Sequence, residues 1–211
     1  MFLTQLGRKY GTDKANPTHT HLGKTYCDVY EKYFNDIRNE VKTFIEIGVL
    51  NGRSLLMWEE YFPNATIYGV DINPNVKQFE NGRVKILIGD QNNPDFLKKL
   101  EDIGQYDILL DDGSHIIRHQ INSFNTLFKN CKYYYVIEDL RCSYEENINK
   151  HDIRKIWPGQ AFNDPTDDLK NYRKDMNDFL LSHIKQMDFH QTKKLFSIKF
   201  YPMIAIFECI K

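Results

Sequence analysis

The stretch TFIEIGVLNGRS, residues 43–54, constrains the fold of this chain more than any other. It joins a short apolar run, Thr43–Ile47, to a turn with two glycines and then to a helical pattern that begins near Arg53. A buried strand, a glycine turn and a helix N-terminus can hold a small ligand, because glycine admits close approach and the helix offers free N–H groups. Open α/β sheets bind ligands at this place, outside the carboxyl ends of their strands. We therefore expect an α/β fold with a cofactor site formed by Glu46, Gly48, Gly52 and Ser54.

The glycine spacing disfavours one class of cofactor. Glu-x-Gly-x-x-x-Gly lacks the central glycine of Gly-x-Gly-x-x-Gly, which lets the backbone of dinucleotide enzymes approach a pyrophosphate. A second apolar run, Thr66–Val70, ends at Asp71, where a carboxylate can accept both hydroxyls of a ribose. The pattern predicts a nucleoside-bearing cofactor, and a dinucleotide-dependent oxidoreductase stays open as a disfavoured alternative.

The stretch EIGVLNGRS resembles motif I of class I S-adenosylmethionine (SAM) methyltransferases, most of all the variant in metal-dependent O-methyltransferases of the catechol type. The resemblance implies SAM as the cofactor. It also implies that the third apolar run, Val84–Ile88, ends beside the adenine, which would be held by Asp90 and Gln91. Asp90 could equally cap the helix that follows.

Two acidic pairs follow the fourth and fifth apolar runs. Tyr106–Leu110 leads into DDGSH, residues 111–115, and Tyr133–Ile137 leads into a Glu-Asp pair. Neighbouring parallel strands end at the same edge of a sheet, so we expect both pairs in one pocket. Side chains alternate along a strand, so only one of Asp111 and Asp112 should face that pocket directly.

Clustered carboxylates repel one another, and a hard divalent cation relieves that repulsion. An all-oxygen ligand set suits Mg²⁺, with Mn²⁺ or Ca²⁺ as alternatives. Helix caps and solvated loop acids are the competing interpretation of the same residues. We assign Asp111 to the cofactor, and the metal ligands that we predict are Asp112, Glu138 and Asp139.

The N-terminal sequence GTDK, residues 11–14, followed by His21 and Tyr26, resembles the signature of macrolide sugar O-methyltransferases of the mycinamicin and macrocin type. DDGSH and the Glu-Asp pair resemble the metal site and base of that family, and the resemblance covers Leu6–Glu208. It implies a SAM- and metal-dependent O-methyltransferase with His115 as the base. The acceptor would be a hydroxyl of a sugar or glycan-like molecule, on a capsule, a lipopolysaccharide or a macrolide. We expect substrate or cofactor contacts from Thr12, Asp13, Lys14 and His21. The alternatives are a helix cap or turn at Thr12 and Asp13, and a solvated loop at His21.

The length of 211 residues fits one α/β domain, with residues 1–40 as an N-terminal helical segment. Residues 140–167 show no periodicity and exceed the usual loop length of about 12–15 residues, which predicts an active-site lid. A helix over Asp168–Met187 and two strands around Tyr201–Pro202 end the pattern. Such a hairpin resembles the antiparallel strands of class I methyltransferases. The predicted fold is therefore a three-layer, Rossmann-like α/β sheet, mostly parallel, with a C-terminal antiparallel hairpin.

Charge and hydropathy exclude other classes. With 28 Lys and Arg against 29 Asp and Glu, the net charge of −1 gives no long-range field to attract nucleic acid or an anionic membrane. No apolar run approaches the ~20 residues that cross a bilayer, and the N-terminus lacks the apolar region of a signal peptide. The four scattered cysteines suggest reduced structural thiols.

We expect a cytoplasmic protein whose partner is a small-molecule or nucleotide-linked sugar acceptor, with a homo-oligomer allowed. A non-catalytic SAM-binding module is the second alternative. It would need neither a base nor a metal, so the acidic pairs and His115 argue against it.

Overall fold

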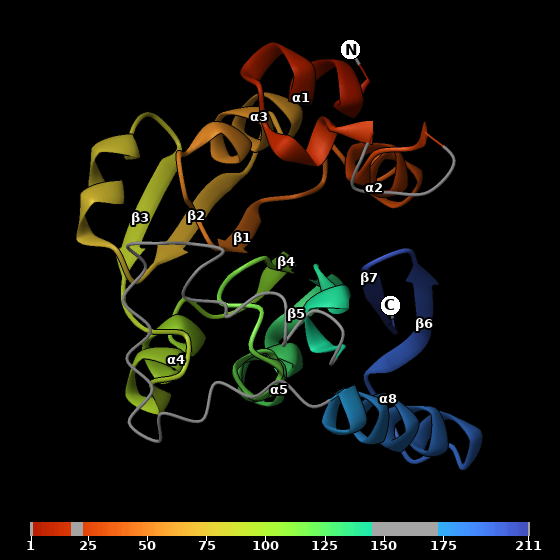
Figure 1. The fold of residues 1–211 in the computed structure, drawn as a ribbon. Coiled ribbons are helices and arrows are strands. Elements are labelled where there is room, and N and C mark those ends of the chain that lie inside the picture. The colour runs from red at the N-terminus through yellow and green to blue at the C-terminus, as the bar shows by residue number, and fades with distance from the viewer. Residues whose placement is uncertain (1, 18–22, 145–172, 211) are drawn as a thin grey trace.

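The computed structural model describes residues 2–17, 23–144 and 173–210, in which seven strands form one sheet between two layers of helices (Figure 1). The strand order is β3-β2-β1-β4-β5-β7-β6. The first five strands run parallel, whereas β7 pairs antiparallel with both β5 and β6. This arrangement confirms the predicted fold class. The strands are β1 (Thr43–Ile47), β2 (Thr66–Asp71), β3 (Val84–Ile88), β4 (Tyr106–Asp111), β5 (Cys131–Ile137), β6 (Leu195–Tyr201) and β7 (Ile204–Cys209).

The direction of the strand order reverses between β1 and β4. Crossover connections run away from this point on both sides, which leaves a crevice outside the carboxyl ends of these strands. The residues that follow β1, β2, β4 and β5 therefore meet at one edge of the sheet, as the sequence predicts.

Helices cover both faces of the sheet (Figure 1). On one side lie α1, α2 and α3, and on the other lie α4, α5 and α8. Neighbouring strand residues alternate between the two cores, so Phe44 packs with the first group of helices and Ile45 with the second. The helices are α1 (Leu3–Tyr10), α2 (Tyr26–Phe34), α3 (Arg53–Tyr61), α4 (Pro94–Glu101), α5 (Ile117–Leu127) and α8 (Arg173–Asp188), with short 3₁₀ turns η1 (Asp13–Ala15), η4 (Pro74–Phe79), η5 (Phe128–Asn130) and η6 (Leu140–Ser143).

An aromatic cluster fixes the N-terminal helices on the sheet. Phe34 of α2 packs edge-on against Trp58 of α3, with ring centroids 6.1 Å apart, and Trp58 lies 4.8 Å from Phe44 of β1. All three side chains are fully buried. The cluster confirms that the aromatic stripe of residues 26–34 packs on the sheet.

The observed boundaries differ from the predicted ones by one or two residues. Strands β2 and β4 each extend to include the terminal aspartate, and β5 begins at Cys131 because that residue pairs with Tyr106. Helix α5 spans Ile117–Leu127 rather than Arg118–Phe128, since Phe128 opens the turn η5.

Several sequence predictions lie outside the described residues. These are His21, residues 145–167 of the predicted lid, and the first residues of the predicted helix that begins at Asp168. In the described parts of the chain, none of the helices combines the length and apolar character required to cross a bilayer. The four cysteines form no disulfide there.

Candidate functional site

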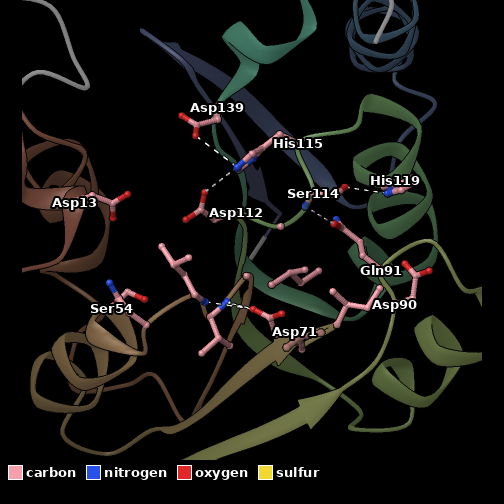
Figure 2. A pocket seen from close by; sticks show the side chains of 18 of the residues that line it. Asp13, Ser54, Asp71, Asp90, Gln91, Asp112, Ser114, His115, His119 and Asp139 are labelled. Carbon is pink, nitrogen blue, oxygen red and sulfur yellow. Dashed lines mark hydrogen bonds and ion pairs between the residues drawn. The ribbon is translucent and has the colours of Figure 1, made fainter. Parts of the chain in front are cut away.

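A pocket opens at the carboxyl ends of β1, β2 and β4, and Figure 2 shows polar side chains turned into it from several elements. Its wall contains residues of η1, of the turn after β1, of the loops after β2, β3 and β4, and the residue that ends the acidic pair after β5. The sequence-predicted residues on this wall are Thr12, Asp13, Lys14, Gly48, Ser54, Asp71, Asp90, Gln91, Asp112, His115 and Asp139.

The turn after β1 requires its two glycines. Gly48 has a φ of +97°, and a Cβ there would lie 2.1 Å from the backbone oxygen of Asp112. Gly52 has a φ of +72° and is the N-cap of α3, where a Cβ would lie 2.6 Å from the ring of Phe79. Only glycine fits at both places. Gly48 forms part of the pocket wall, whereas Gly52 lies behind it and lets η4 pack against the start of α3.

Asp71 fixes the same turn from the end of β2. Its Oδ2 accepts the backbone N–H groups of Val49 at 2.9 Å and Leu50 at 3.2 Å, and its Oδ1 accepts that of Asn73 at 2.8 Å. Figure 2 shows this carboxylate beside the turn. The side chain therefore lines the pocket and also shapes the loop around it.

Glu46 lies beneath the pocket rather than on its wall. The side chain is fully buried, and its Oε2 accepts a hydrogen bond from Ser54 Oγ at 2.7 Å. Burial raises the pKa of Glu46 to about 7, against the opposing effects of Lys14 and Ser54. Ser54 lies on the wall, so it connects the buried acid to the pocket.

The two aspartates at the end of β4 face different directions, as the strand alternation predicts. Asp112 faces the pocket, whereas Asp111 is fully enclosed and accepts a hydrogen bond from Gln91 Nε2 at 2.6 Å. Burial raises the pKa of Asp111 to about 6. Gln91 in turn accepts the backbone N–H of Ser114 at 3.1 Å, and Asp111 Oδ1 accepts that of Gly113 at 3.4 Å, so Asp111 supports the pocket wall through both Gln91 and Gly113. Asp90 lies on the wall and accepts the N–H of Asn92 at 2.7 Å, whereas the cap of the following helix α4 is Asn93 rather than Asp90.

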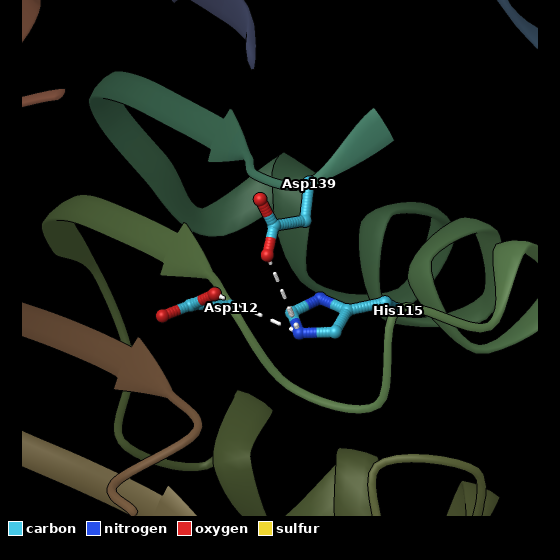
Figure 3. Close-up of side chains that lie close together, drawn as sticks. All are labelled: Asp112, His115 and Asp139. Atoms are coloured by element: carbon cyan, nitrogen blue, oxygen red, sulfur yellow. Dashed lines mark ion pairs between the residues drawn. The ribbon is translucent and has the colours of Figure 1, made fainter. Parts of the chain in front are cut away.

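Three side chains converge where β4 and β5 end (Figure 3). Asp112, His115 and Asp139 each offer one ligand atom, and these atoms all lie within 4.8 Å of one another. His115 Nε2 is 3.7 Å from Asp139 Oδ2 and 4.0 Å from Asp112 Oδ1. His115 and Asp139 both adopt the left-handed backbone conformation, with φ of 56° and 55°. Non-glycine residues rarely adopt it, and such positions concentrate at functional sites.

Asp139 carries its negative charge in spite of burial. Burial by itself disfavours the charged form, but His115 and the Tyr26 hydroxyl outweigh it and hold the pKa of this carboxyl below its ordinary value. Tyr26 Oη donates to Asp139 Oδ1 at 2.6 Å, while Oδ2 faces His115. Tyr26 thus fixes which oxygen is turned toward the pocket.

Glu138 is turned differently from the other predicted ligands. Its Oε2 accepts a hydrogen bond from Lys14 Nζ at 2.8 Å, its Oε1 accepts one from the Tyr30 hydroxyl, and the residue is 1% exposed. Burial raises the pKa of Glu138, followed by the charge of Asp112, and Lys14 opposes the shift. The structure therefore groups Asp112 and Asp139 with His115 at the pocket, whereas Glu138 lies behind the wall, bonded to Lys14 and Tyr30.

Several pocket residues were missed by the sequence reasoning. Ser114 Oγ and His119 Nδ1 lie 2.9 Å apart on the pocket wall, and Asn51 lies in the cofactor turn. Ser114 is part of DDGSH and Asn51 part of EIGVLNGRS, so their motifs located them without assigning a role. His119 carried no signal, because it reads as one polar residue on an ordinary helix.

The oxygen donors at the end of the pocket fit a hard divalent cation. Asp112 and Asp139 bring carboxylate oxygens within 4.8 Å of each other at the pocket surface. Mg²⁺ binds in proteins through one or two carboxylates and keeps positions for water or substrate oxygens. His115 lies beside these oxygens, with its Nε2 3.7 Å from Asp139 Oδ2.

Comparison with known proteins places this geometry in a class. No family model matches the chain. The SAH-bound methyltransferase PaMTH1 of Podospora anserina superposes with a TM-score of 0.53 and 16% identity, covering 99% of this chain and 88% of that one. MycE, crystallised with Mg and SAH, superposes with a TM-score of 0.76 and 30% identity, covering 99% of this chain and 55% of MycE. The fold is that of a class I methyltransferase.

Within that class, the homologues of this chain are macrolide sugar O-methyltransferases, as the sequence resemblance predicts. A tetracenomycin-rhamnoside 2'-O-methyltransferase of Streptomyces olivaceus is 40% identical over 152 residues, which are 67% of this chain and 38% of that protein. Mycinamicin VI 2''-O-methyltransferase of Micromonospora griseorubida is 34% identical over 167 residues, 74% of this chain and 37% of that protein. The match thus spans less than half the length of these curated relatives.

Proposed function

We propose that this protein is a SAM- and divalent-metal-dependent O-methyltransferase that modifies a hydroxyl of a sugar or glycan-like small molecule. One observation supports it above the others. A single pocket joins the glycine turn and Asp71 at one end to Asp112, His115 and Asp139 at the other. A transferase needs the donor and the acceptor hydroxyl in contact, and one continuous pocket provides that.

The cofactor end would hold the nucleoside part of SAM. Gly48 admits close backbone approach, and Asp71 offers its carboxylate to the ribose hydroxyls while it fixes the turn. Asp90 and Gln91 would lie along the adenine. Asp111 supports Gln91 from behind.

The acceptor end would remove a proton from a hydroxyl whose pKa lies far above 7. When bound, SAM supplies an electrophilic methyl group and the divalent cation supplies positive charge beside the acceptor oxygen. Asp112 and Asp139 would hold the cation, and Glu138 stays a predicted ligand that Lys14 and Tyr30 contact. His115 Nε2 faces the same place, so it is positioned to take the proton as a general base.

Further parts of the proposal rest on the sequence and on the relatives. MycE has also been crystallised with mycinamicin VI, and the curated relatives carry names of rhamnosyl and macrolide acceptors. By extension, the acceptor of this protein would be a glycoside or a nucleotide-linked sugar. The net charge of −1 supports no role with nucleic acid. A single domain over residues 1–211, a lid formed by residues 140–167, a homo-oligomer and a cytoplasmic location stay predictions.

The test separates the cation ligands from the base. Asp112→Asn keeps the side-chain shape but removes a charge, so Mg²⁺ affinity should fall and excess Mg²⁺ should partly restore methyl transfer from SAM. His115→Ala should lose about 10²–10⁴ in rate without recovery by Mg²⁺, because a proton acceptor is missing. Raising the pH should restore part of the His115→Ala activity.

The acceptor for this test is a panel of rhamnosides and macrolide glycosides, with tritium-labelled SAM as the methyl donor. Rescue of His115→Ala by Mg²⁺, without rescue of Asp112→Asn, would reverse the two roles. Full activity of both variants in EDTA would remove the metal-dependent mechanism.

A further inference from the structure

Lys14 is a buried cation from the N-terminal segment. It is 2% exposed and lies in η1, which follows the N-cap Thr12. Its Nζ donates to Asp112 Oδ2 and, at 2.8 Å, to Glu138 Oε2, and it lies 3.5 Å from Glu46 Oε1. Among the residues that the structure describes, no other Lys or Arg forms an ion pair with any of these three carboxylates.

The three acids come from three strand ends. Glu46 belongs to β1, Asp112 follows β4 and Glu138 follows β5, so the sheet itself forces them together at the switch between β1 and β4. Buried carboxylates without a cation repel one another and lose their hydration. From the sequence we predicted that a divalent cation alone offsets the charges of the clustered carboxylates. The fold brings the Lys14 ammonium group to the same cluster.

The two oxygens of Asp112 face different groups, the Lys14 ammonium and the predicted cation site. Its Oδ2 is bonded to Lys14, and its Oδ1 faces His115 in the group with Asp139. A cation bound by Asp112 and Asp139 would therefore lie a few ångströms from the Lys14 ammonium, separated from it by one carboxylate. Like charges at this distance in a buried site oppose each other strongly.

We propose that Lys14 is the internal counter-ion of this acidic cluster and that it weakens the binding of the divalent cation with which it shares Asp112. Lys14 holds Asp112 and Glu138 together without the cation, so the pocket is already built when the cation arrives. The inference rests on the cation site of the proposed function. It makes Lys14 a positioning residue for the acidic cluster.

The experiment compares Lys14→Met with wild type by calorimetric titration of Mg²⁺ and by melting in EDTA and in excess Mg²⁺. Methionine keeps most of the volume and removes the charge. In EDTA the variant should melt well below wild type, because the buried Glu46 and Glu138 and the half-buried Asp112 lose their counter-ion. It should bind Mg²⁺ about tenfold more tightly and gain more in melting temperature from it, because the opposing charge is gone.

The matched control is Lys9→Met. Lys9 lies in α1, shortly before Lys14 in the sequence. It also forms an ion pair, with Glu60, but its side chain is 48% exposed. The same change of charge should leave both the Mg²⁺ affinity and the melting temperature within error of wild type.

A second variant covers the case in which Lys14→Met does not fold in EDTA. Lys14→Met combined with Glu138→Gln removes one acid together with the ammonium, so it should recover most of the lost melting temperature. Failure of the double variant to recover would show that Lys14 acts by packing alone and would overturn the inference.

The titration distinguishes this inference from the proposed function. Equal or weaker Mg²⁺ binding by Lys14→Met, when wild type binds, overturns the competition between the two cations. Wild type that binds no Mg²⁺ overturns the cation site of the proposed function. In that event the melting temperatures of the single and double variants in EDTA still decide whether Lys14 is the counter-ion.

Discussion

Replacing Tyr26 with phenylalanine removes a single oxygen from the site. The Tyr26 hydroxyl donates to Asp139 Oδ1 at 2.6 Å, and the ring is 1% exposed. Burial, followed by the charge of Asp139, raises the pKa of this tyrosine, so the hydroxyl keeps its proton and remains a donor. Without it, Asp139 can rotate away from the position in which Oδ2 faces His115.

The magnitude follows from the kind of bond. A hydrogen bond to a charged group contributes about 1.5–3 kcal/mol, and groups that orient a metal ligand typically account for about 10–100-fold in metal affinity. We expect Tyr26→Phe to bind Mg²⁺ about 10–100-fold more weakly, measured by isothermal titration calorimetry. Methyl transfer should recover at saturating Mg²⁺, because the base and the cofactor turn are unchanged.

The same helix supplies the control. Tyr33 Oη lies 2.6 Å from Tyr201 Oη, away from the pocket wall, so Tyr33→Phe makes the same chemical change without touching Asp139. It should bind Mg²⁺ as wild type does. Equal Mg²⁺ affinity for Tyr26→Phe and Tyr33→Phe would refute the orienting role of Tyr26.

Three further changes test other parts of the site. Asp71→Ala should weaken SAM binding by about 1.5–3 kcal/mol, because the turn and the predicted ribose site lose the same carboxylate. Unchanged SAM affinity in calorimetry would reject the assignment of Asp71 to the ribose. Gly48→Ala should lower the melting temperature more than Gly104→Ala. Both glycines have positive φ, but only at Gly48 would a Cβ meet a backbone oxygen. Equal decreases in melting temperature would reject the close contact at Gly48. Burial lowers the pKa of His119 from 6.5 to about 4, so the folded protein in EDTA should lose up to about 3 kcal/mol as the pH falls through that range. Urea unfolding of His119→Asn should show a smaller loss of unfolding free energy as the pH falls. A pH dependence identical to that of wild type would contradict the assignment of this loss to His119.

The strands and the location of the pocket were predictable because they depend on local patterns. Apolar runs such as Thr43–Ile47 and Val84–Ile88 have strand length and polar flanks, and both were placed to the residue. Parallel strands bring their carboxyl ends to one edge, so DDGSH had to meet the acidic pair after β5. The alternation of side chains also predicted that Asp111 and Asp112 would separate.

The detailed contacts were not predictable, because they depend on how distant segments dock. Glu138 and Asp139 are adjacent in sequence and chemically alike, yet the first meets Lys14 and the second meets Tyr26. Tyr26 was assigned to the helix stripe that packs on the sheet, and it does pack there. A tyrosine ring can bury its apolar body while its hydroxyl reaches a polar partner, and the periodicity of a helix does not reveal that second contact.

The contacts of the N-terminal segment with the acidic cluster join residues that lie about half the chain apart. Lys14 is separated from Asp112 by 98 positions and from Glu138 by 124, and Tyr26 is separated from Asp139 by 113. Contacts of such long sequence separation close large loops and tend to form late in folding. During synthesis, Lys14 leaves the ribosome long before β5 exists, so the neutralised cluster cannot form until the central sheet is nearly complete. Protection of the pocket should therefore appear after protection of the β1–β2 pairing, and competence for chemistry would mark the end of folding rather than an early stage.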